Sequence, residues 1–449
     1  MGGRHYLPLT EKQRQIMLQD IGVNSQEELF EDIPPEVRLK ETLNLPPSFT
    51  ETEVLRHLGG LAGKNLNIKD YACFLGAGVY DHFIPTIVKH VTGRSEFYTS
   101  YTPYQAEASQ GMLQAIFEYQ TLICELTGME VTNASLYDGA TALAEAALMA
   151  CVTTRRQKIL LSRSVNPFYS DVLKRYFDSR NLSYSEVPLK EGKTDLERAE
   201  AALDGDHAAL VVQTPNFFGL LENLQGVADF LHAKGALLLV ITDPISLPLV
   251  KAPGEYDADI VVGEGQSLGS SPSFGGPLLG FLATREKFMR RLPGRIVGET
   301  TDAHGRRGFV LTLQTREQHI RRERATSNIC SNEALNVLAA AVYMVALGPE
   351  GLREVAFLCL QKAAYAREKM SGIPGLELVF PGYYFKEFAV RLPQDAKELN
   401  RKLLERKIIG GLDLSPLYPE LNNSMLFCVT ENRTRAEIDS LIQGLEAWK

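Results

Sequence analysis

The sequence is poor in the features that mark disulfide-rich and metal-binding proteins. Its 449 residues include six cysteines, and no two of them are spaced as C-x-x-C. Disulfide frameworks and zinc sites both need closely grouped cysteines or histidines, so neither is predicted here. We expect free thiols in a reducing compartment, no bound metal and a cytoplasmic location.

Long apolar segments and an excess of basic charge are missing as well. The longest apolar run, Val337 to Leu347, is well short of the ~20 residues that span a bilayer. The N-terminus has no apolar stretch typical of a secretion signal. The formal net charge of -8 disfavours general binding to nucleic acids or to anionic membranes. We therefore expect neither nucleic acid nor membrane among the partners.

What the sequence does contain is the composition of an ordinary globular protein with two or three domains. Hydrophobic residues make up 45% and charged residues 23% of the chain, which allows a large core. Capping residues and paired prolines indicate a helical arm over residues 1–65. We expect a large α/β domain over residues 66–330 and a smaller C-terminal α/β domain over residues 331–449.

Apolar strands alternate with helices between residues 157 and 283. The strands are apolar on both faces, which is typical of a parallel sheet covered by helices on both sides. The predicted strands are Ile159–Leu161, Ala208–Val212, Leu237–Ile241 and Asp259–Val262. The predicted helices are Pro167–Asp178, Asp195–Leu203 and Asn223–Lys234.

Two polar features lie where parallel sheets of this kind bind ligands. Asp243 follows a predicted strand, and its carboxylate could pair with the ring nitrogen of a cofactor or could belong to a simple Asp-Pro turn. Gly139, Ala140 and Thr141 begin an Ala-rich helix, whose exposed N–H groups suit a phosphate. An N-cap formed by Asp138 is the commoner explanation of this pattern, and its carboxylate disfavours a phosphate beside it.

The stretch Asp257–Ala283 resembles the hairpin that carries the cofactor lysine in α/β enzymes dependent on pyridoxal phosphate. An apolar strand leads into a small-residue loop, and a turn at Gly275 and Gly276 leads into a second apolar strand. No lysine lies between Lys251 and Lys287. The stretch therefore keeps the hairpin but lacks the amine that would form an imine with the cofactor.

Two further segments, Phe97–Gln105 and His304–Arg324, have an unusual composition. The first combines four aromatic residues with hydroxyls and fits either the wall of a substrate cleft or an aromatic plug between domains. The second carries six arginines and few acids, which would suit a carboxylate substrate or an acidic protein. A solvated helix face over Gln314–Arg324 is the simpler explanation for most of these arginines.

Three long motifs make the chain resemble the P-protein of the glycine cleavage system. They are YTPYQAEASQG from Tyr101, ELTGMEVTNASLYDGATALAEA from Glu125 and GRRGFVLTLQTREQHIRRERATSNIC from Gly305. The resemblance covers nearly the whole chain and is greatest to the shorter α subunit of the two-subunit form. It implies the aspartate-aminotransferase-like fold type I of pyridoxal-phosphate-dependent transferases, with a large mostly parallel-sheet domain and a smaller C-terminal α/β domain.

The resemblance also implies an activity that is divided between two chains. Family members decarboxylate glycine on pyridoxal phosphate and transfer the aminomethyl group to the lipoyl arm of the H-protein. This is the reaction of an aminomethyl-transferring glycine dehydrogenase. The cofactor lysine belongs to a partner β subunit in an α2β2 heterotetramer, which accounts for its absence here. Pyridoxal phosphate is therefore expected on the partner, and no catalytic lysine is expected in this chain.

The resemblance assigns residues of this chain to two groups. The candidates for the partner's glycine pocket or for the subunit interface are Tyr98, Tyr101, Tyr104, Thr326, Ser327 and Asn328. The expected vestigial cofactor site comprises Gly139, Ala140, Thr141, Asp243, Gln266 and Ser267. The chain departs from the family pattern at Asn166-Pro167, where a histidine that could stack on the cofactor is expected.

Two other interpretations of the sequence stay open. The chain could be a non-catalytic structural or regulatory protein that reuses the fold, or a self-sufficient enzyme that uses Lys251 or Lys287. Neither lysine is well placed, because Lys251 lies before the first strand of the hairpin and Lys287 opens a helix beyond it.

Overall fold

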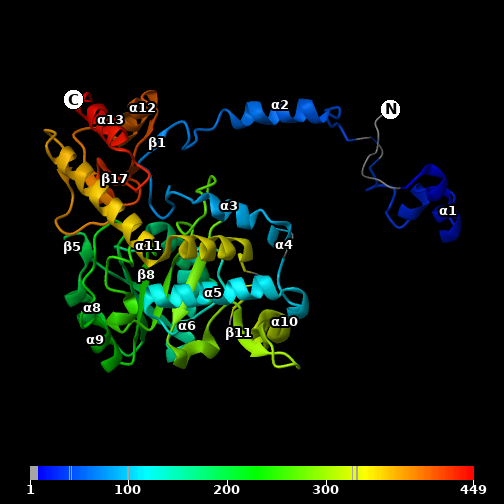
Figure 1. Ribbon diagram of the computed structural model, residues 1–449, viewed down its shortest axis with the longest axis horizontal. Helices are drawn as coiled ribbons and strands as arrows, with labels where there is room; N and C mark the ends of the chain where they lie inside the picture. The colour runs from blue at the N-terminus through cyan, green and yellow to red at the C-terminus, as the bar shows by residue number, and fades with distance from the viewer. Residues whose placement is uncertain are drawn as a thin grey trace. The chain divides into compact units, whose positions relative to one another are not determined.

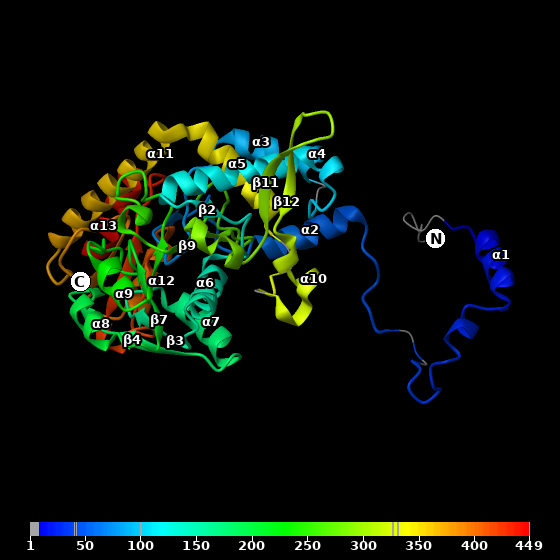
Figure 2. The ribbon, with the colours of Figure 1, turned by 90° about the horizontal axis from the view of Figure 1, so that it is seen from below.

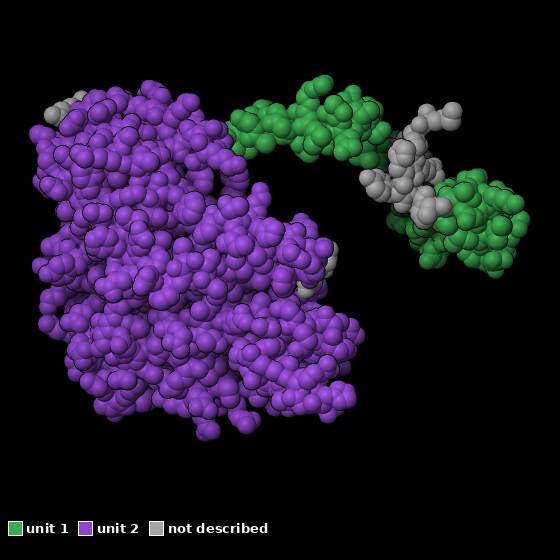
Figure 3. Space-filling model, in the orientation of Figure 1, with its two compact units in different colours: residues 1–66 green, residues 67–449 purple. Residues whose placement is uncertain are grey.

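The computed structural model of the chain describes residues 9–39, 41, 43–98, 101–325, 327–329 and 332–448. The chain divides into two compact units, residues 1–66 and residues 67–449, which Figure 3 shows in different colours.

The first unit contains two capped helices that have no core of their own. Helix α1 (Glu11–Ile21) begins after Thr10 and helix α2 (Glu51–Ala62) begins after Thr50, and each threonine forms a capping box with the residue three positions on. Neither helix buries a residue, although α2 carries apolar side chains such as Leu55, which is 67% exposed. Helices of this kind gain most of their stability by packing an apolar face onto another surface.

A seven-stranded sheet forms the centre of the second unit (Figures 1 and 2). Its strand order is β2-β10-β9-β8-β7-β3-β4. The five strands from β9 to β4 in this order are parallel, and β10 is antiparallel to both of its neighbours. The bounds are β2 (Val131–Thr132), β3 (Lys158–Ser162), β4 (Ser183–Val187), β7 (His207–Gln213), β8 (Leu237–Thr242), β9 (Ile260–Glu264) and β10 (Gly280–Thr284). The predicted mostly parallel sheet is confirmed.

Side chains of the central strands alternate between two hydrophobic cores, one on each face of the sheet. Leu238 of β8 belongs to the core that also contains residues of α5, α8, α9 and α11, whereas Leu239 belongs to the core that contains residues of α6 and α7. Helices therefore cover both faces, as the doubly apolar strands predict. The bounds are α5 (Gln110–Thr127), α6 (Gly139–Thr154), α7 (Pro167–Asp178), α8 (Leu196–Ala202), α9 (Val227–Ala233) and α11 (Ala334–Ser371).

A four-stranded antiparallel sheet carries the C-terminal part of the second unit. Its order is β13-β14-β17-β16, and α12 and α13 supply residues to its core. The short strand β1 pairs in parallel with β15, which ties the chain after residue 67 to this part. The bounds are β1 (Ala72–Cys73), β13 (Glu377–Leu378), β14 (Glu387–Arg391), α12 (Ala396–Glu405), β15 (Ile408–Ile409), β16 (Leu412–Asp413), β17 (Ser424–Cys428) and α13 (Arg435–Glu446). Residues 67–449 form one unit, so the expected boundary at residue 330 stays a prediction.

Helix α11 runs from the large sheet to the C-terminal part (Figure 2). It packs against α5 and α3 (Thr86–Thr92) and also contacts α13. Gly348, with φ 63° and ψ -178°, interrupts the helical geometry where the sequence predicts a helix end near Gly348-Pro349. By length and composition alone α11 could cross a membrane, but its buried residues belong to the cores of this unit, as those of a core helix do.

Three features differ from the sequence-based expectation. The edge strand β4 has a polar, partly exposed sequence, SYSEV, and the apolar pattern does not predict it. The single helix expected over Gln314–Arg324 is wrong, because these residues form three short helical turns, but Arg321, Arg322 and Arg324 are exposed as expected. These turns follow a hairpin of β11 (Ile296–Thr301) and β12 (Arg307–Thr312), which the sequence pattern does not predict.

Candidate functional site

Helix α6 begins at the edge of the sheet where the parallel strands end. Asp138 is its N-cap: Oδ1 of Asp138 accepts the N–H of Thr141 at 2.7 Å, and Oγ1 of Thr141 accepts the N–H of Asp138 at 3.2 Å. Glu264, at the end of β9, brings a second carboxylate, whose Oε2 accepts the N–H of Gly139 at 2.9 Å. Ala140 lies buried between these two donors. The N–H groups of Gly139 and Thr141 are thus bonded to carboxylates of the chain itself.

Glu264 is a buried carboxylate that three backbone N–H groups surround. Besides Gly139, its donors are Gln266 at 2.9 Å and Leu279 at 2.8 Å, both to Oε1. Burial raises the pKa of Glu264 to about 7, although these N–H groups favour the ionised form. The negative charge of Asp138 adds to the effect of burial. An external anion at the start of α6 would therefore meet two carboxyl groups.

Asp243, directly after β8, forms a buried ion pair with Lys386. Nζ of Lys386 lies 2.7 Å from Oδ2 of Asp243, 2.9 Å from Nε2 of His82 and 3.4 Å from the centroid of the Tyr80 ring. Burial disfavours an ammonium ion, but the surrounding groups, with the Asp243 carboxylate foremost, together outweigh this effect, and the pKa of Lys386 is raised. Lys386 is therefore a cation whose counter-ion is the carboxylate at the end of β8.

Residues 76–82 lie across the hairpin loop that follows β9. The N–H of Tyr80 donates to Oε1 of Gln266 at 2.9 Å, and Nε2 of Gln266 donates to the carbonyl oxygen of Tyr80 at 3.0 Å. The Tyr80 hydroxyl donates to Oε2 of Glu387 at 2.8 Å, and the N–H of Ala77 donates to Oε1 of Glu387 at 2.6 Å. The loop that would carry a cofactor lysine is thus bonded to another segment of the same chain.

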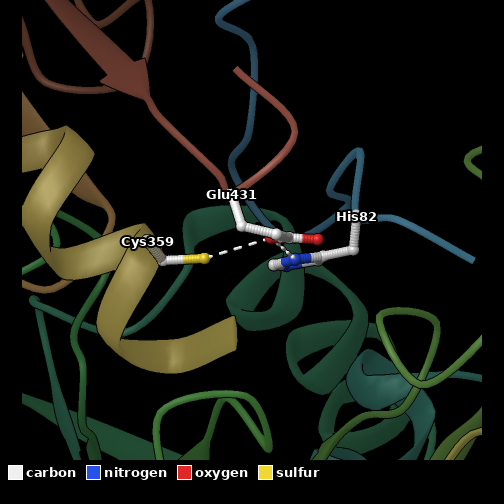
Figure 4. Close-up of side chains that lie close together, drawn as sticks. All are labelled: His82, Cys359 and Glu431. Atoms are coloured by element: carbon white, nitrogen blue, oxygen red, sulfur yellow. Dashed lines mark hydrogen bonds and ion pairs between the residues drawn. The ribbon is translucent and has the colours of Figure 1, made fainter. Parts of the chain in front are cut away.

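His82, Cys359 and Glu431 form a group of side chains that could ligate a metal (Figure 4). Nδ1 of His82 lies 2.6 Å, and Sγ of Cys359 lies 3.2 Å, from Oε2 of Glu431. The Lys386 ammonium can only donate hydrogen bonds, so Nε2 of His82 must be the acceptor of the bond between them. The proton of the His82 ring is therefore on Nδ1, and Nδ1–H donates to Glu431. Burial raises the pKa of the Cys359 thiol, which disfavours the thiolate that a metal would need. The three side chains therefore satisfy one another through hydrogen bonds.

Glu431 is the acidic end of this hydrogen-bond chain. Burial alone would raise its pKa, but the bonds from His82, Phe83 and Cys359 prevail and lower the pKa of Glu431 to about 2. The N–H of Phe83 contributes a bond of 2.6 Å to Oε1. Glu431 is ionised across the ordinary pH range and fixes the orientation of the His82 ring.

The tyrosines expected at the partner's pocket lie on the surface of this chain. Tyr98, Tyr101 and Tyr104 are 67%, 78% and 54% exposed. Nη2 of Arg295 donates to the Tyr104 hydroxyl at 2.6 Å, and the guanidinium lies 4.8 Å from the ring centroid. The three tyrosines take no part in the hydrogen bonds around Asp243 and α6.

The other expected interface residues follow the hairpin and its helical turns. Ser327 is buried, and its hydroxyl accepts the N–H of Ile329 at 3.1 Å. Asn328 is exposed. Thr326 lies outside the described residues. Of the arginines in the basic segment, Arg307 pairs with Glu299 across the hairpin at 2.7 Å.

Lys251 and Lys287 are engaged away from Asp243. Nζ of Lys251 lies 3.5 Å from Oε1 of Gln225, and Nζ of Lys287 lies 3.3 Å from Oδ1 of Asp259. Neither amine contacts the residues around α6 or the hairpin loop.

Sequence reasoning missed the side chains that fill this site. They are Tyr80, His82, Glu264, Lys386, Glu387 and Glu431. One local signal was present, because Lys386 and Glu387 are charged residues within the otherwise apolar run from Tyr383 to Val390. Lysine and glutamate are almost never fully buried unless they are paired, so charges inside an apolar run indicate buried partners.

The residues of this site do not fit pyridoxal phosphate. Asp243, the expected partner of the ring nitrogen, is neutralised by Lys386. Gln266 and Ser267 are buried where the hairpin would present a lysine. Nδ2 of Asn166 donates to the backbone carbonyl of Ala77 at 3.0 Å, so this position offers no stacking ring. The cofactor's ring, its phosphate and its imine each lack the expected partner.

Comparisons with known proteins agree over almost the whole chain. The model of the family described as "Glycine cleavage system P-protein" matches residues 4–445. A relative from Moorella thermoacetica, described as "Probable glycine dehydrogenase (decarboxylating) subunit 1", is 56% identical over 440 residues and is matched over 98% of both chains.

Solved structures are similar as well. An inhibitor-bound glycine decarboxylase (P-protein) of the glycine cleavage system matches with a TM-score of 0.92 and 45% identity, over 98% of this chain and 99% of that chain. Glutamate decarboxylase of Lactobacillus brevis matches with a TM-score of 0.69 and 12% identity, over 95% of this chain and 98% of that chain. The second likeness shows a shared fold alone.

Proposed function

The chain belongs to the glycine cleavage system P-protein family, as a glycine dehydrogenase (decarboxylating) subunit 1, and on this basis we propose that it completes the active site of a lysine-bearing partner subunit. The predicted fold, fold type I of pyridoxal-phosphate-dependent transferases, is confirmed. The proposed reaction is the decarboxylation of glycine, followed by transfer of the aminomethyl group to the lipoyl arm of an H-protein.

One observation carries the proposed division of labour. The Asp243–Lys386 ion pair occupies the place where a cofactor ring would find its carboxylate partner. A site that is filled by its own chain leaves pyridoxal phosphate to the partner, where the cofactor would supply an electron sink for the carbanion formed by loss of CO2.

This chain would contribute exposed side chains and an apolar helix face that contact the partner subunit. The exposed Tyr101 is the foremost candidate to reach the partner's glycine pocket, because it presents both a ring and a hydroxyl to an incoming surface. We propose an α2β2 assembly in which the exposed apolar face of α2 in the N-terminal unit packs on a partner. The free state of the described cysteines supports a cytoplasmic complex.

Reconstitution from separately purified subunits tests this function. The assay is glycine-dependent exchange of labelled CO2, measured for this chain alone, for the partner alone and for the mixture with H-protein. We expect activity from the mixture and none from this chain alone. Full activity of the partner alone would contradict the proposal and support a structural or regulatory role instead.

A further inference from the structure

Lys386 has no part in the proposed reaction, yet it is buried and fully engaged. Its side chain is 2% exposed, and its ammonium contacts Asp243, His82 and the face of the Tyr80 ring. Removing an ammonium ion from water is costly, and each of these contacts offsets part of that cost. The chain thus holds one cation at a defined point inside its own vestigial site.

Asp243 and the start of α6 mark the two ends of that site. In enzymes of this cofactor class a carboxylate binds the ring nitrogen, and a helix start binds the phosphate. Here the cation at the first end is the Lys386 ammonium, 2.7 Å from Asp243. The group at the second end is the Glu264 carboxyl, whose Oε2 accepts the N–H of Gly139 at 2.9 Å, as a phosphate oxygen would. The first end carries the positive charge of a cofactor ring nitrogen, and the second end carries an oxygen acceptor where the cofactor's phosphate would have accepted a hydrogen bond.

We propose that Lys386 and Glu264 are internal substitutes for the cofactor, the first for its ring cation and the second for its phosphate. This assignment rests on the proposed function, in which the cofactor belongs to the partner. Tyr80 and His82 contact Lys386, and Tyr80 is also bonded to Gln266 of the hairpin loop. Side chains of this chain therefore already occupy the contacts of Asp243 and of the start of α6, and pyridoxal phosphate is excluded from both.

The contacts of Lys386 identify it as a counter-ion and exclude the role of an imine-forming amine. An imine requires the neutral amine, which is reached when a lysine is desolvated or placed beside another cation. Lys386 is desolvated as well, but no second cation lies beside it among the described contacts; its neighbours are a carboxylate, the lone pair of Nε2 of His82 and an aromatic face. All three stabilise the ammonium form.

The same contacts tie the two sheets of the second unit together. Asp243 follows β8 of the large sheet, and Lys386 directly precedes β14 of the C-terminal sheet. His82, from the segment before α3, continues the chain of bonds to Glu431, which follows β17. Removing the Lys386 side chain would leave the largely buried carboxylate of Asp243 without its counter-ion and would cut this connection.

Chemical rescue of the variant Lys386→Ala in the purified full chain tests the assignment. We expect the melting temperature to fall by roughly 5 °C or more relative to the unmodified chain, because a buried charge loses its partner. The control Lys402→Ala removes a half-exposed ion pair with Glu398 and is expected to melt close to the unmodified chain. n-Butylammonium chloride, which matches the lysine side chain, should raise the melting temperature of Lys386→Ala only.

Sodium chloride and tetramethylammonium chloride at equal ionic strength control for salt and for cation size, and neither should rescue the variant. Equal rescue by all three salts, or a melting temperature of Lys386→Ala equal to that of Lys402→Ala, would overturn the assignment.

If Lys386→Ala does not fold, the pair Lys386→Met and Lys386→Met/Asp243→Asn decides instead. The double variant, which removes both charges, should melt above the single variant, and a double variant that melts no higher would overturn the assignment. None of these readouts uses glycine turnover. Failure of CO2 exchange in the reconstituted complex would therefore refute the proposed function and leave the result on Lys386 standing.

Discussion

The variant Glu264→Gln should remove a pH dependence from the stability of the chain. Glu264 has its pKa raised from an ordinary value of 4.5 to about 7, chiefly by burial. Below about pH 4.5 the carboxyl is protonated in both the folded and the unfolded chain, and its contribution to stability is complete. As the pH rises towards about 7, the unfolded chain loses the proton first, and the folded chain is destabilised.

The size of this effect follows from the shift of about 2.5 pKa units, at about 1.4 kcal/mol each, which gives roughly 3 kcal/mol between about pH 4.5 and pH 7. Glutamine keeps the shape of the side chain but does not titrate. It also replaces one acceptor by an NH2 group, which leaves the N–H of Gly139 or the pair from Gln266 and Leu279 without a partner, at a cost of about 1–3 kcal/mol.

Urea unfolding of the purified chain, followed by far-UV circular dichroism at several pH values, measures this difference. We expect Glu264→Gln to be less stable than the unmodified chain at about pH 5 and equal or more stable at about pH 8. The control Glu200→Gln changes an exposed residue of α8 and should follow the unmodified chain at every pH. Parallel curves for Glu264→Gln and the unmodified chain would refute the reasoning, since they would mean that the backbone N–H groups keep Glu264 ionised.

Three further outcomes follow from the structure. Gly219→Ala should lower the free energy of unfolding in urea by at least about 2 kcal/mol, because at φ 83° the new Cβ would lie 1.9 Å from a backbone carbonyl oxygen of β14. Its control, Gly205→Ala, has open space around the new Cβ and should be nearly neutral. Glu431→Gln should lower the free energy of unfolding by about 3 kcal/mol at neutral pH, because the pKa of Glu431 is lowered from 4.5 to about 2 in the folded chain. This difference should vanish as the pH falls through about 2, and a difference that persists in acid would contradict the prediction. In the reconstituted complex Tyr101→Phe should raise KM for glycine several-fold at an unchanged melting temperature, whereas Tyr104→Phe should also lower stability by about 1 kcal/mol, because it loses the bond to Arg295. Unchanged kinetics in both variants would mean that these tyrosines only pack against neighbouring residues.

The large sheet could be predicted because burial on both faces leaves strands made of apolar residues alone, as in Leu237–Ile241 of β8. The edge strand β4 escapes this rule, since only one of its residues, Val187, is buried and its other side chains are at least partly exposed. The hairpin β11–β12 was hidden for a similar reason: its outer half is charged and exposed. The apolar pattern of the sequence therefore predicts central strands of a sheet better than edge strands and exposed hairpins.

The two ends of the candidate site could be predicted as well, because a strand end at Asp243 and a helix start at Gly139 are local features of the sequence. The occupants of the site could not. Lys386 and Tyr80 approach Asp243 only after the C-terminal sheet has packed against the large one, and no short-range pattern encodes that approach. The missing lysine of the hairpin was visible in the sequence, but its replacement by an internal cation was not.

Reduction of the assembled complex with borohydride, followed by peptide mass spectrometry of both chains, tests the central claim most directly. Borohydride fixes pyridoxal phosphate to the lysine that holds it as an imine. We expect the phosphopyridoxyl group on a lysine of the partner subunit and on none in this chain. A phosphopyridoxyl group on Lys386, or on any other lysine of this chain, would contradict the account.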